Sequence, residues 1–381
     1  MDQPLYVAGV AQSLQTRSSP TERLEESIFR VASAALQDAG ITRDAVDNVV
    51  IAASDALDGR AISSMLTACP AGAYFKDEIK VADEGAFAVI AAALRLLTGE
   101  FKTSLIVSWS RPSECSLSAA QSVMAEPFFT RPFGLSHVTA TALLAGCYRN
   151  RYSVPLEVPA EVVAKNRAHG CRNPLLSDPV ALTAEDVLAS RYVAFPVREL
   201  EMSPAADGLT ALVLTRDQHL GSHNHPTPRL IGMGWATEIY DPGERDLTRF
   251  SALETAAKQA YQMAGVGDPR KDLDVAEICD VSAWHELMSY EALQFCRPGE
   301  ASNFFRSGST GMSGELPVNP SGGCLSAYPV FSAGMTRFVE CCLQLSGRAG
   351  PRQIPGATTG LAHGCTGFAG QSHCVLICQA A

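Results

Sequence analysis

Leu-Pro-Val-Asn-Pro-Ser-Gly-Gly-Cys-Leu-Ser-Ala-Tyr-Pro, residues 316–329, is the stretch of sequence that says most about this chain. It places rigid and small residues directly before an apolar helix, which we expect to begin near Ser332. The prolines fix the φ angle, and Gly322 and Gly323 allow backbone conformations that a Cβ would forbid. Such a loop lowers the stability of the fold, so its presence suggests that it positions functional side chains. We therefore expect this stretch, called the signature loop below, to lie at a functional site.

The composition is that of a large globular protein. The chain has 381 residues, of which 46% are hydrophobic and 18% charged, enough for one large unit or two similar domains. The net charge of -10 and the absence of a lysine and arginine cluster argue against nucleic acid or an anionic membrane as a partner. No apolar run approaches the roughly 20 residues of a membrane helix. The first residues lack a basic segment, so we expect no secretory signal and a cytoplasmic location.

The cysteines and histidines do not form a recognisable metal motif. None of the 12 cysteines belongs to a Cys-x-x-Cys pair, so we expect reduced thiols rather than a zinc or redox site. His219, His223 and His225 have spacings that a metal could use, but they lie in a polar, turn-rich stretch. We interpret that stretch as a solvated linker between two halves, and we expect no metal and no tightly bound cofactor.

Hydrophobic periodicity predicts a layered α/β fold. Strands are expected at 5–10, 48–53, 80–82, 103–108, 209–214, 230–235, 275–279, 358–362 and 373–378. Helices are expected at 22–39, 85–98, 252–264 and 333–345, with a further helix ending at 293. The helix at 85–98 is apolar on most sides and lies between two apolar strands, which is typical of the centre of a layered domain.

The chain has the organisation of two halves and an insertion. Residues 34–40 and 260–265 end their helices in similar ways, Ala-Ala-Leu-Gln-Asp-Ala-Gly and Ala-Tyr-Gln-Met-Ala-Gly, which suggests a duplicated unit. The alternative is that helix endings in α/β proteins resemble one another in any case. We expect halves at 1–226 and 227–381. Residues 111–195, with several prolines and three amphipathic helices at 139–152, 160–169 and 184–190, would form an inserted cap over a site.

The signature loop resembles that of the thiolase superfamily, whose usual ending is Leu-Ser-x-Gly-His-Pro. Further stretches resemble the sterol-carrier-protein-type thiolases and lipid-transfer-protein-type aldolases in the right order. They are 191–198 with 206–208, 278–280 with 286–287, and 295–300. The resemblance covers about residues 5–379. It implies a thiolase fold, a duplicated α-β-α-β-α five-layered sandwich with a cap, usually dimeric and acting on coenzyme A thioesters.

The position of the family's nucleophile is altered. Thiolysis uses a cysteine at a helix N-terminus, where the helix dipole lowers the thiol pKa. Counting back from Thr98-Gly99-Glu100 places that position at Ala82, which cannot attack a thioester. A shifted register would offer Asp83 or Glu84, either as an acid or base or as a helix cap. We expect Ala82 and Glu84 to contact the substrate.

The resemblance also places a tyrosine where the family has a histidine that binds the thioester oxygen. Tyr328 could donate a hydrogen bond to an oxyanion or act as an acid, as in the lipid-transfer aldolases that this stretch resembles. Alternatively, Tyr328 packs into a former active-site pocket that no longer has a catalytic role. Tyr240 is a weaker second tyrosine candidate on the aldolase interpretation.

His285 and Asp280 also belong to the expected catalytic set, together with Tyr328 and Cys365. His285 stands where the family has an asparagine, and it is either a donor or base or a partly exposed helix histidine. Asp280 matches an aspartate at a strand end, where it either orients a neighbour or caps a buried backbone.

Cys365 falls on the family's acid/base cysteine within the glycine-rich stretch 362–370. The alternative is a small buried residue, since other members of the sterol-carrier branch place this cysteine at the position of Val281. We expect Cys115 and Cys324 to be packing residues. The remaining predicted substrate contacts are Asn319, Gly322, Gly323 and His363.

Three functions follow from these departures. The first is an enzyme of lipid metabolism that makes or breaks a C–C bond beside a thioester carbonyl without a covalent acyl-enzyme. The second is a catalytically silent subunit of a heteromeric acyltransferase or thiolase complex. The third, an ordinary acetyl-CoA acyltransferase, fits Ala82 and Tyr328 poorly. Expected partners are acyl-CoA and a second copy, a thiolase-like chain, or a zinc-ribbon/OB-fold protein.

Overall fold

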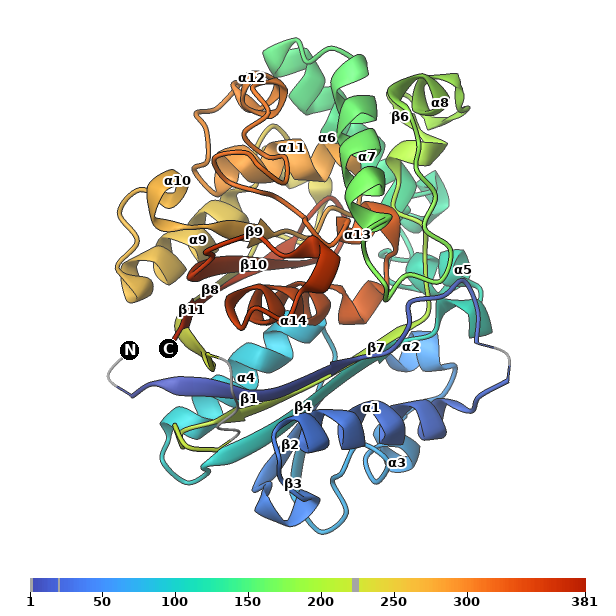
Figure 1. Ribbon diagram of the computed structural model, residues 1–381. Coiled ribbons are helices and arrows are strands. Elements are labelled where there is room, and N and C mark those ends of the chain that lie inside the picture. Colours follow the sequence, from blue (N-terminus) through green and yellow to red (C-terminus); the bar gives the residue numbers. More distant parts are fainter. Residues whose placement is uncertain (1–2, 20, 221–225) are drawn as a thin grey trace.

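The computed structural model describes residues 3–19, 21–220 and 226–381 (Figure 1). His223 and His225 therefore lie outside the described residues, while His219 is exposed. The first half contributes five strands, in the spatial order β3 (Asp77–Val81), β2 (Asn48–Ala52), β4 (Thr103–Ser110), β7 (Gly208–Thr215) and β1 (Leu5–Gln12). Strand β7 is antiparallel to both of its neighbours, whereas β3, β2 and β4 are parallel.

The second half repeats this arrangement in the opposite direction across the sheet. Its strands are β8 (Pro228–Thr237), β11 (Ser372–Ala380), β10 (Thr359–Thr366) and β9 (Val275–Glu277), with β11 again antiparallel to both neighbours. Strands β1 and β8 pair only through Leu5 with Leu230 and Tyr6 with Arg229, which joins the halves into one nine-stranded sheet. The predicted duplication of an α/β unit is confirmed.

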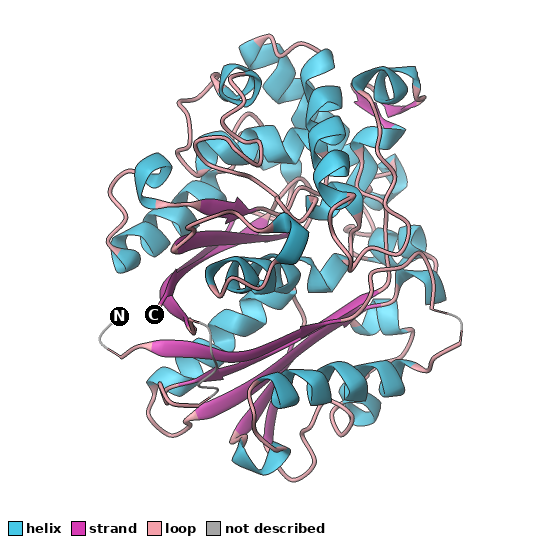
Figure 2. Cartoon of the chain, in the orientation of Figure 1, coloured by secondary structure: helices cyan, strands magenta, loops and turns pink. Residues whose placement is uncertain are grey.

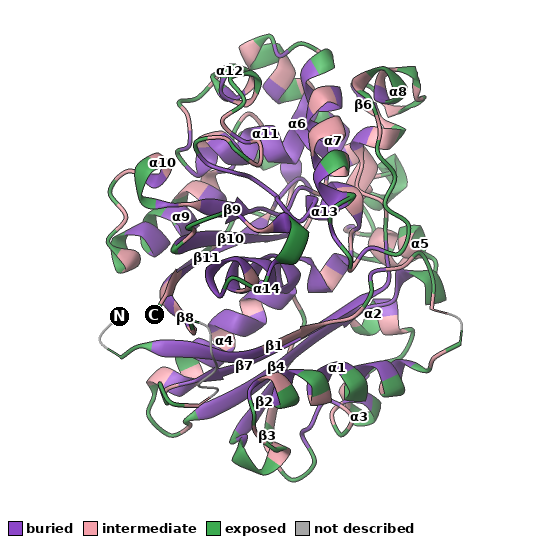
Figure 3. Cartoon of the chain, viewed as in Figure 1, coloured by how far each residue is buried: buried purple, intermediate pink, exposed green. Residues whose placement is uncertain are grey.

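Helices on both sides of each half-sheet make the five layers. Figure 1 shows α4 (Gly85–Leu97) and α14 (Ala333–Leu345) side by side between the half-sheets, with α1 (Leu24–Asp38) and α9 (Ser251–Ala264) on the outer faces. The two central helices are largely buried in Figure 3 and share one apolar cluster with both half-sheets. Figure 2 shows the same alternation of helix and strand layers.

The same glycine contact recurs in both halves. A Cβ on Gly9 of β1 would lie 2.4 Å from the carbonyl oxygen of Ala35, and one on Gly232 of β8 would lie 2.5 Å from that of Ala260. Ala35 and Ala260 occupy matching places in the two similar helix endings. Glycine allows the outer helix to approach the strand closely in each half, so the similarity in sequence has a physical reason.

The remaining helices lie above and to the right of the sheet in Figure 1. They include α5 (Leu117–Val123), α6 (His137–Tyr152), α7 (Glu157–Gly170), α8 (Ala184–Ala189), α11 (Ala283–Ala292) and α12 (Ala301–Arg306). The sequence did not predict α5, α12 or six shorter elements, which are too short to show periodicity: α2 (Asp55–Asp58), α3 (Ser64–Thr67), β5 (Tyr192–Ala194), β6 (Val197–Arg198), α10 (Pro269–Asp272) and α13 (Gly323–Ser326). None of the described helices is both long and apolar enough to cross a membrane.

Candidate active site

A cavity of about 200 Å³ lies where the two halves and residues 111–195 meet. Side chains of the first half, of α5 and α6, and of the second half all line it. They include Ser54, Leu57, Glu84, Leu117, Met124, His137, Met202, Val281, His285, Tyr328 and Cys365. Its wall is mostly apolar with a few convergent polar groups, which is typical of a small-molecule site.

Tyr328 reaches this cavity from the end of the signature loop. Its backbone is fixed on both sides, because its N–H donates to Pro204 and its carbonyl accepts from Ala206, each at 2.9 Å. The side chain packs against the buried thiols of Cys279, Cys324 and Cys365. Burial and these thiols raise the pKa of the Tyr328 phenol well above its usual value. The hydroxyl is therefore a neutral hydrogen-bond donor at physiological pH.

His285 enters the cavity from the first turn of α11. The helix begins there because Ser282 caps it: the Ser282 hydroxyl accepts from the backbone N–H of His285 and lies 2.7 Å from its Nδ1. The side chain is buried, so the alternative of a partly exposed helix histidine is wrong. Burial, with His373 and His137 nearby, lowers the pKa of His285 to about 3 and keeps the ring neutral.

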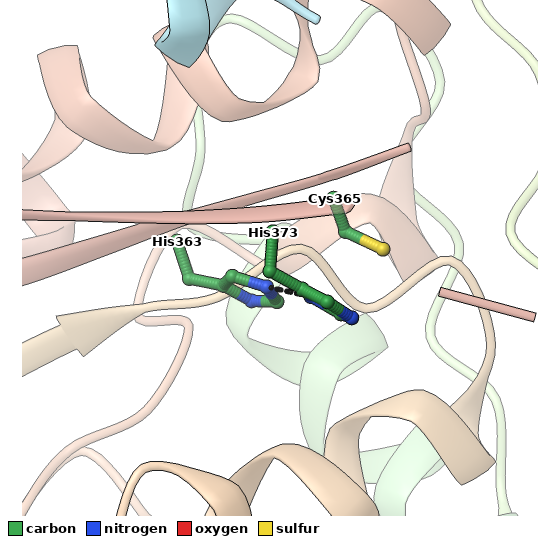
Figure 4. Close-up of side chains that lie close together, drawn as sticks. All are labelled: His363, Cys365 and His373. Atoms are coloured by element: carbon green, nitrogen blue, oxygen red, sulfur yellow. Dashed lines mark hydrogen bonds between the residues drawn. The ribbon is translucent and has the colours of Figure 1, made fainter. Parts of the chain in front are cut away.

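Cys365 lies on β10 beside a buried pair of histidines (Figure 4). The ligand atoms of His363, Cys365 and His373 all lie within 4.8 Å of one another, a spacing that could hold a metal. The hydrogen bonds of the two histidines favour a metal-free pair of neutral rings. His373 Nε2 donates to the carbonyl of Gly370 at 2.9 Å, so its Nδ1 accepts from His363 Nε2, also at 2.9 Å. His363 Nδ1 then accepts from the backbone N–H of Cys279 at 3.3 Å.

This chain of hydrogen bonds occupies all four ring nitrogens in neutral tautomers. A metal would have to displace at least the bond between the two rings, so the hydrogen-bonded residues present fit a neutral histidine pair better than a metal centre. Burial lowers the pKa of both histidines, to about 3 for His373. Burial and Glu84 raise the pKa of the Cys365 thiol above its usual range, so it is protonated and a poor nucleophile.

Glu84 is the N-cap of α4 and lines the same cavity. Its Oε2 accepts from the backbone N–H of Ala86 at 2.9 Å, and its Oε1 accepts from the N–H of Gly334 in the first turn of α14. The predicted capping role is confirmed. Ala82 is exposed and is not among the cavity-lining residues, while burial raises the pKa of Glu84 to about 8.

The other predicted site residues lie in the signature loop and beneath it, rather than in the cavity wall. Asp280 accepts hydrogen bonds from the backbone N–H groups of Cys324 and Leu325, at 2.5 and 3.2 Å. Gly322 and Gly323 have positive φ angles of 99° and 64°, and a Cβ on Gly323 would lie 2.4 Å from the Asp280 carboxylate. Burial and Glu286 raise the pKa of Asp280 to about 7. The carboxylate therefore orients the loop.

Asn319 connects the loop to α11. Its Oδ1 accepts from the backbone N–H of Ile278 at 2.7 Å, and its Nδ2 donates to Glu286 at 3.1 Å. Lys165 of α7 pairs with the same glutamate at 2.5 Å. His363 lies on β10, behind Cys365, and is not a lining residue.

A buried ion pair that sequence reasoning missed lies below the loop. Arg337 of α14 is 2.9 Å from Glu277 of β9 and donates to the hydroxyl of Ser321 at 2.6 Å. Ser321 also donates to Glu277 at 2.7 Å. The sequence did contain a sign of this pair. Glu277 and Arg337 each stand within an apolar run, where a charged residue needs a buried partner.

Comparison with known proteins assigns this architecture. Residues 237–380 match the family model described as thiolase C-terminal domain-like. The acetyl-CoA acetyltransferase of Methanothermobacter thermautotrophicus is 31% identical over 241 residues, which are 62% of this chain and 62% of the relative. Both matches are to thiolase-like proteins, so the chain is similar to members of the thiolase superfamily. Bovine sterol carrier protein 2 is 29% identical over 57% of this chain and 41% of its own length, so the matches span only part of each relative.

A solved structure supports the fold across the whole chain. The Ltp2–ChsH2(DUF35) aldolase superposes with a TM-score of 0.84 and 24% identity, covering 99% of this chain and 98% of that one. At this identity the likeness establishes the thiolase fold alone. Together with sterol carrier protein 2, it confirms the expected resemblance to the sterol-carrier and lipid-transfer branch of the superfamily.

Proposed function

We propose that this thiolase-like chain makes or breaks a C–C bond beside the carbonyl of a coenzyme A thioester, without a covalent acyl-enzyme. The observation that carries the proposal is the convergence of Tyr328, His285 and Cys365 on one cavity, with no cysteine at the expected nucleophile position. All three groups are neutral there, and the nucleophile position holds the exposed Ala82. These groups can donate hydrogen bonds and protons, but they provide no thiolate to hold an acyl group.

The cavity groups suit an enolate intermediate. In cleavage of a β-hydroxyacyl-CoA, the hydroxyl gives its proton to a base in the cavity wall and becomes a carbonyl. The electrons of the Cα–Cβ bond pass to the thioester enolate, and the α-carbon then takes up a proton. Tyr328 would stabilise the enolate oxygen as a donor in a largely apolar site. His285 would be a second donor, and Cys365 a further hydrogen-bond donor on the β10 side.

A second candidate is a silent subunit of a heteromeric complex. The absence of a thiolate in the described cavity fits this function equally well, and the fold neighbour Ltp2 is solved together with ChsH2(DUF35). A homodimer, a thiolase-like partner and a zinc-ribbon/OB-fold partner remain proposals. Turnover by the isolated chain separates the enzyme from the silent subunit.

The test is incubation with panels of β-hydroxyacyl-CoA and β-ketoacyl-CoA esters. We expect release of a carbonyl compound and a shortened acyl-CoA from the hydroxy panel. Tyr328→Phe should reduce turnover by about 100-fold or more, the scale of one oxyanion donor. Cys365→Ser should also slow it, whereas Tyr192→Phe and Cys147→Ser, which alter exposed or partly exposed residues, should not. No turnover and no binding of any ester would exclude the enzyme, and thiolysis of the keto panel would indicate an ordinary thiolase.

A further inference from the structure

Among the described residues that line the cavity, one carries an acidic side chain, Glu84. Glu84 is only 1% exposed, yet no ion pair to it occurs in the part of the chain that the structure describes. Glu277, Glu286 and Glu340 are also buried and each lies beside a lysine or arginine, whereas Glu201, Asp207 and Asp280 share with Glu84 the lack of a described ion pair. A buried carboxyl group without a basic partner is costly as an anion. Its position therefore needs a reason other than an ion pair.

The niche around Glu84 is shaped for a carboxyl group. The N-termini of two central helices, α4 and α14, each direct a backbone N–H at one of its oxygens. Glycines provide the room: a Cβ on Gly334 or on Gly364 would lie 2.4 Å from Oε2. Two helix dipoles and two N–H donors favour the anion, whereas burial opposes it. The opposing effects allow the group to be either protonated or ionised.

The groups that face Glu84 are acids or neutral thiols. Asp83 adjoins it on the same loop, Cys365 and Cys374 face it from β10 and β11, and the pKa values of Cys279 and Tyr328 are raised by it. The thiols and the phenol keep their protons at physiological pH, so they can donate a proton but cannot accept one. His137 and His285 also line the cavity, but burial lowers their pKa values to about 4 and about 3, so they are weaker bases than Glu84, whose pKa is raised to about 8.

We propose that Glu84 is the catalytic acid and base of this cavity, moving one proton between the α-carbon of a coenzyme A thioester and the oxygen of the carbonyl partner. This role rests on the proposed function. In the synthetic direction the carboxylate removes the α-proton and the thioester becomes an enolate. The enolate α-carbon forms a bond to the carbonyl carbon, and the resulting alkoxide takes the proton back from Glu84. Cleavage is the reverse, and neither direction needs another reagent.

The half-reaction at the α-carbon can be measured without knowing the carbonyl partner. The full chain is incubated with acetyl-CoA in D₂O, and deuterium at the acetyl group is measured by mass spectrometry. We expect exchange whose rate rises with pH through the pKa of Glu84, about 8, because the carboxylate is the active form. A single acid or base contributes about 100-fold or more, so Glu84→Gln should lose at least that factor.

Glu201→Gln is the matched control. Glu201 is also buried, its pKa is raised to about 7, and it accepts a hydrogen bond from the Trp284 ring outside the cavity wall. Its exchange rate should equal that of the unmodified chain. Exchange by folded Glu84→Gln within about 3-fold of the original rate would overturn the proposal. If that variant does not fold, a wild-type exchange rate that stays flat from neutral to alkaline pH overturns it equally.

The outcomes separate this inference from the proposed function. A chain that binds acetyl-CoA and cleaves a β-hydroxyacyl-CoA, but whose exchange does not depend on Glu84, retains the proposed function and loses the role of Glu84. A chain that binds no coenzyme A ester loses both. The measurement therefore identifies which of the two statements failed.

Discussion

The support beneath the signature loop and the cavity above it use ionisable residues in opposite ways. Below the loop, two buried carboxylates have basic partners: Glu277 pairs with Arg337 and Glu286 with Lys165. In the cavity, the thiol, the phenol and the imidazole are neutral, and Glu84 has no basic partner in the described part of the chain.

This difference allows the chain to keep the thiolase fold while its cavity carries out the proposed chemistry. The partners below the loop fix its backbone, and the loop's glycines leave room for them. The end of the loop, at Tyr328, and the start of α4, at Glu84, face the cavity and are not required by that network. Substitutions below the loop should therefore unfold the protein, whereas substitutions in the cavity should change its reaction.

The largest effect should come from breaking the ion pair below the loop. Arg337→Met leaves Glu277 buried without its cation, and we expect unfolding to become about 3–5 kcal/mol easier. Urea denaturation followed by circular dichroism measures this. Arg306→Met, which breaks the partly exposed pair with Glu161, is the control and should change stability little. Equal effects of the two substitutions would mean that the buried network does not support the fold.

Removing the carboxylate under the loop should have the next largest effect. Asp280→Ala leaves the N–H groups of Cys324 and Leu325 without acceptors, and we expect a loss of about 2 kcal/mol. The affinity for acyl-CoA should fall at the same time, because the loop end that carries Tyr328 loses its support. Titration calorimetry alongside denaturation measures both. Lost stability with unchanged affinity would show that the loop does not position the cavity.

The sequence predicted the layers better than it predicted the site. Alternating apolar strands and helices identify buried elements without any knowledge of their partners, so most of the long elements were found within a few residues. The roles of Asn319 and His363 could not be read in this way, because which side of the loop a residue faces depends on contacts between distant segments. Asn319 bonds Glu286 and Ile278, so it faces the support rather than the cavity.

The same limit explains Glu84. A glutamate before an apolar helix predicts a cap, and this was correct. That the second helix N-terminus at Gly334 meets the same carboxyl group is a contact across 250 residues, which no local pattern reveals.

The pH dependence of stability distinguishes the two regions by its sign. The folded-state pKa of Glu84, about 8, lies above its ordinary value of 4.5, so the folded protein holds a proton that the unfolded chain releases in this range. Stability should therefore decrease as pH rises from about 4.5 to 8, by at most about 1.4 kcal/mol per pH unit for this group. The difference between the unmodified chain and Glu84→Gln isolates the contribution. Parallel pH profiles would contradict a protonated Glu84.

The smallest effect should come from Tyr240, at the margin of the cavity. Its hydroxyl accepts from the N–H of Glu126 at 2.7 Å and donates to the carbonyl of Met124 at 2.8 Å. Met124 lines the cavity, whereas Tyr240 does not. Tyr240→Phe should cost about 1 kcal/mol or less and raise KM with little change in kcat. Steady-state kinetics on the best ester of the hydroxy panel measures this, and a large fall in kcat would move Tyr240 into the catalytic set.

The most direct test of the account is the intact mass of the protein during turnover of a β-hydroxyacyl-CoA. We predict that a carbonyl compound and a shortened acyl-CoA are released while the protein mass stays unchanged, because no thiolate in the cavity can hold an acyl group. A protein mass increased by one acyl group, with the adduct located on Cys365 or another cysteine, would contradict the account and indicate covalent thiolase chemistry.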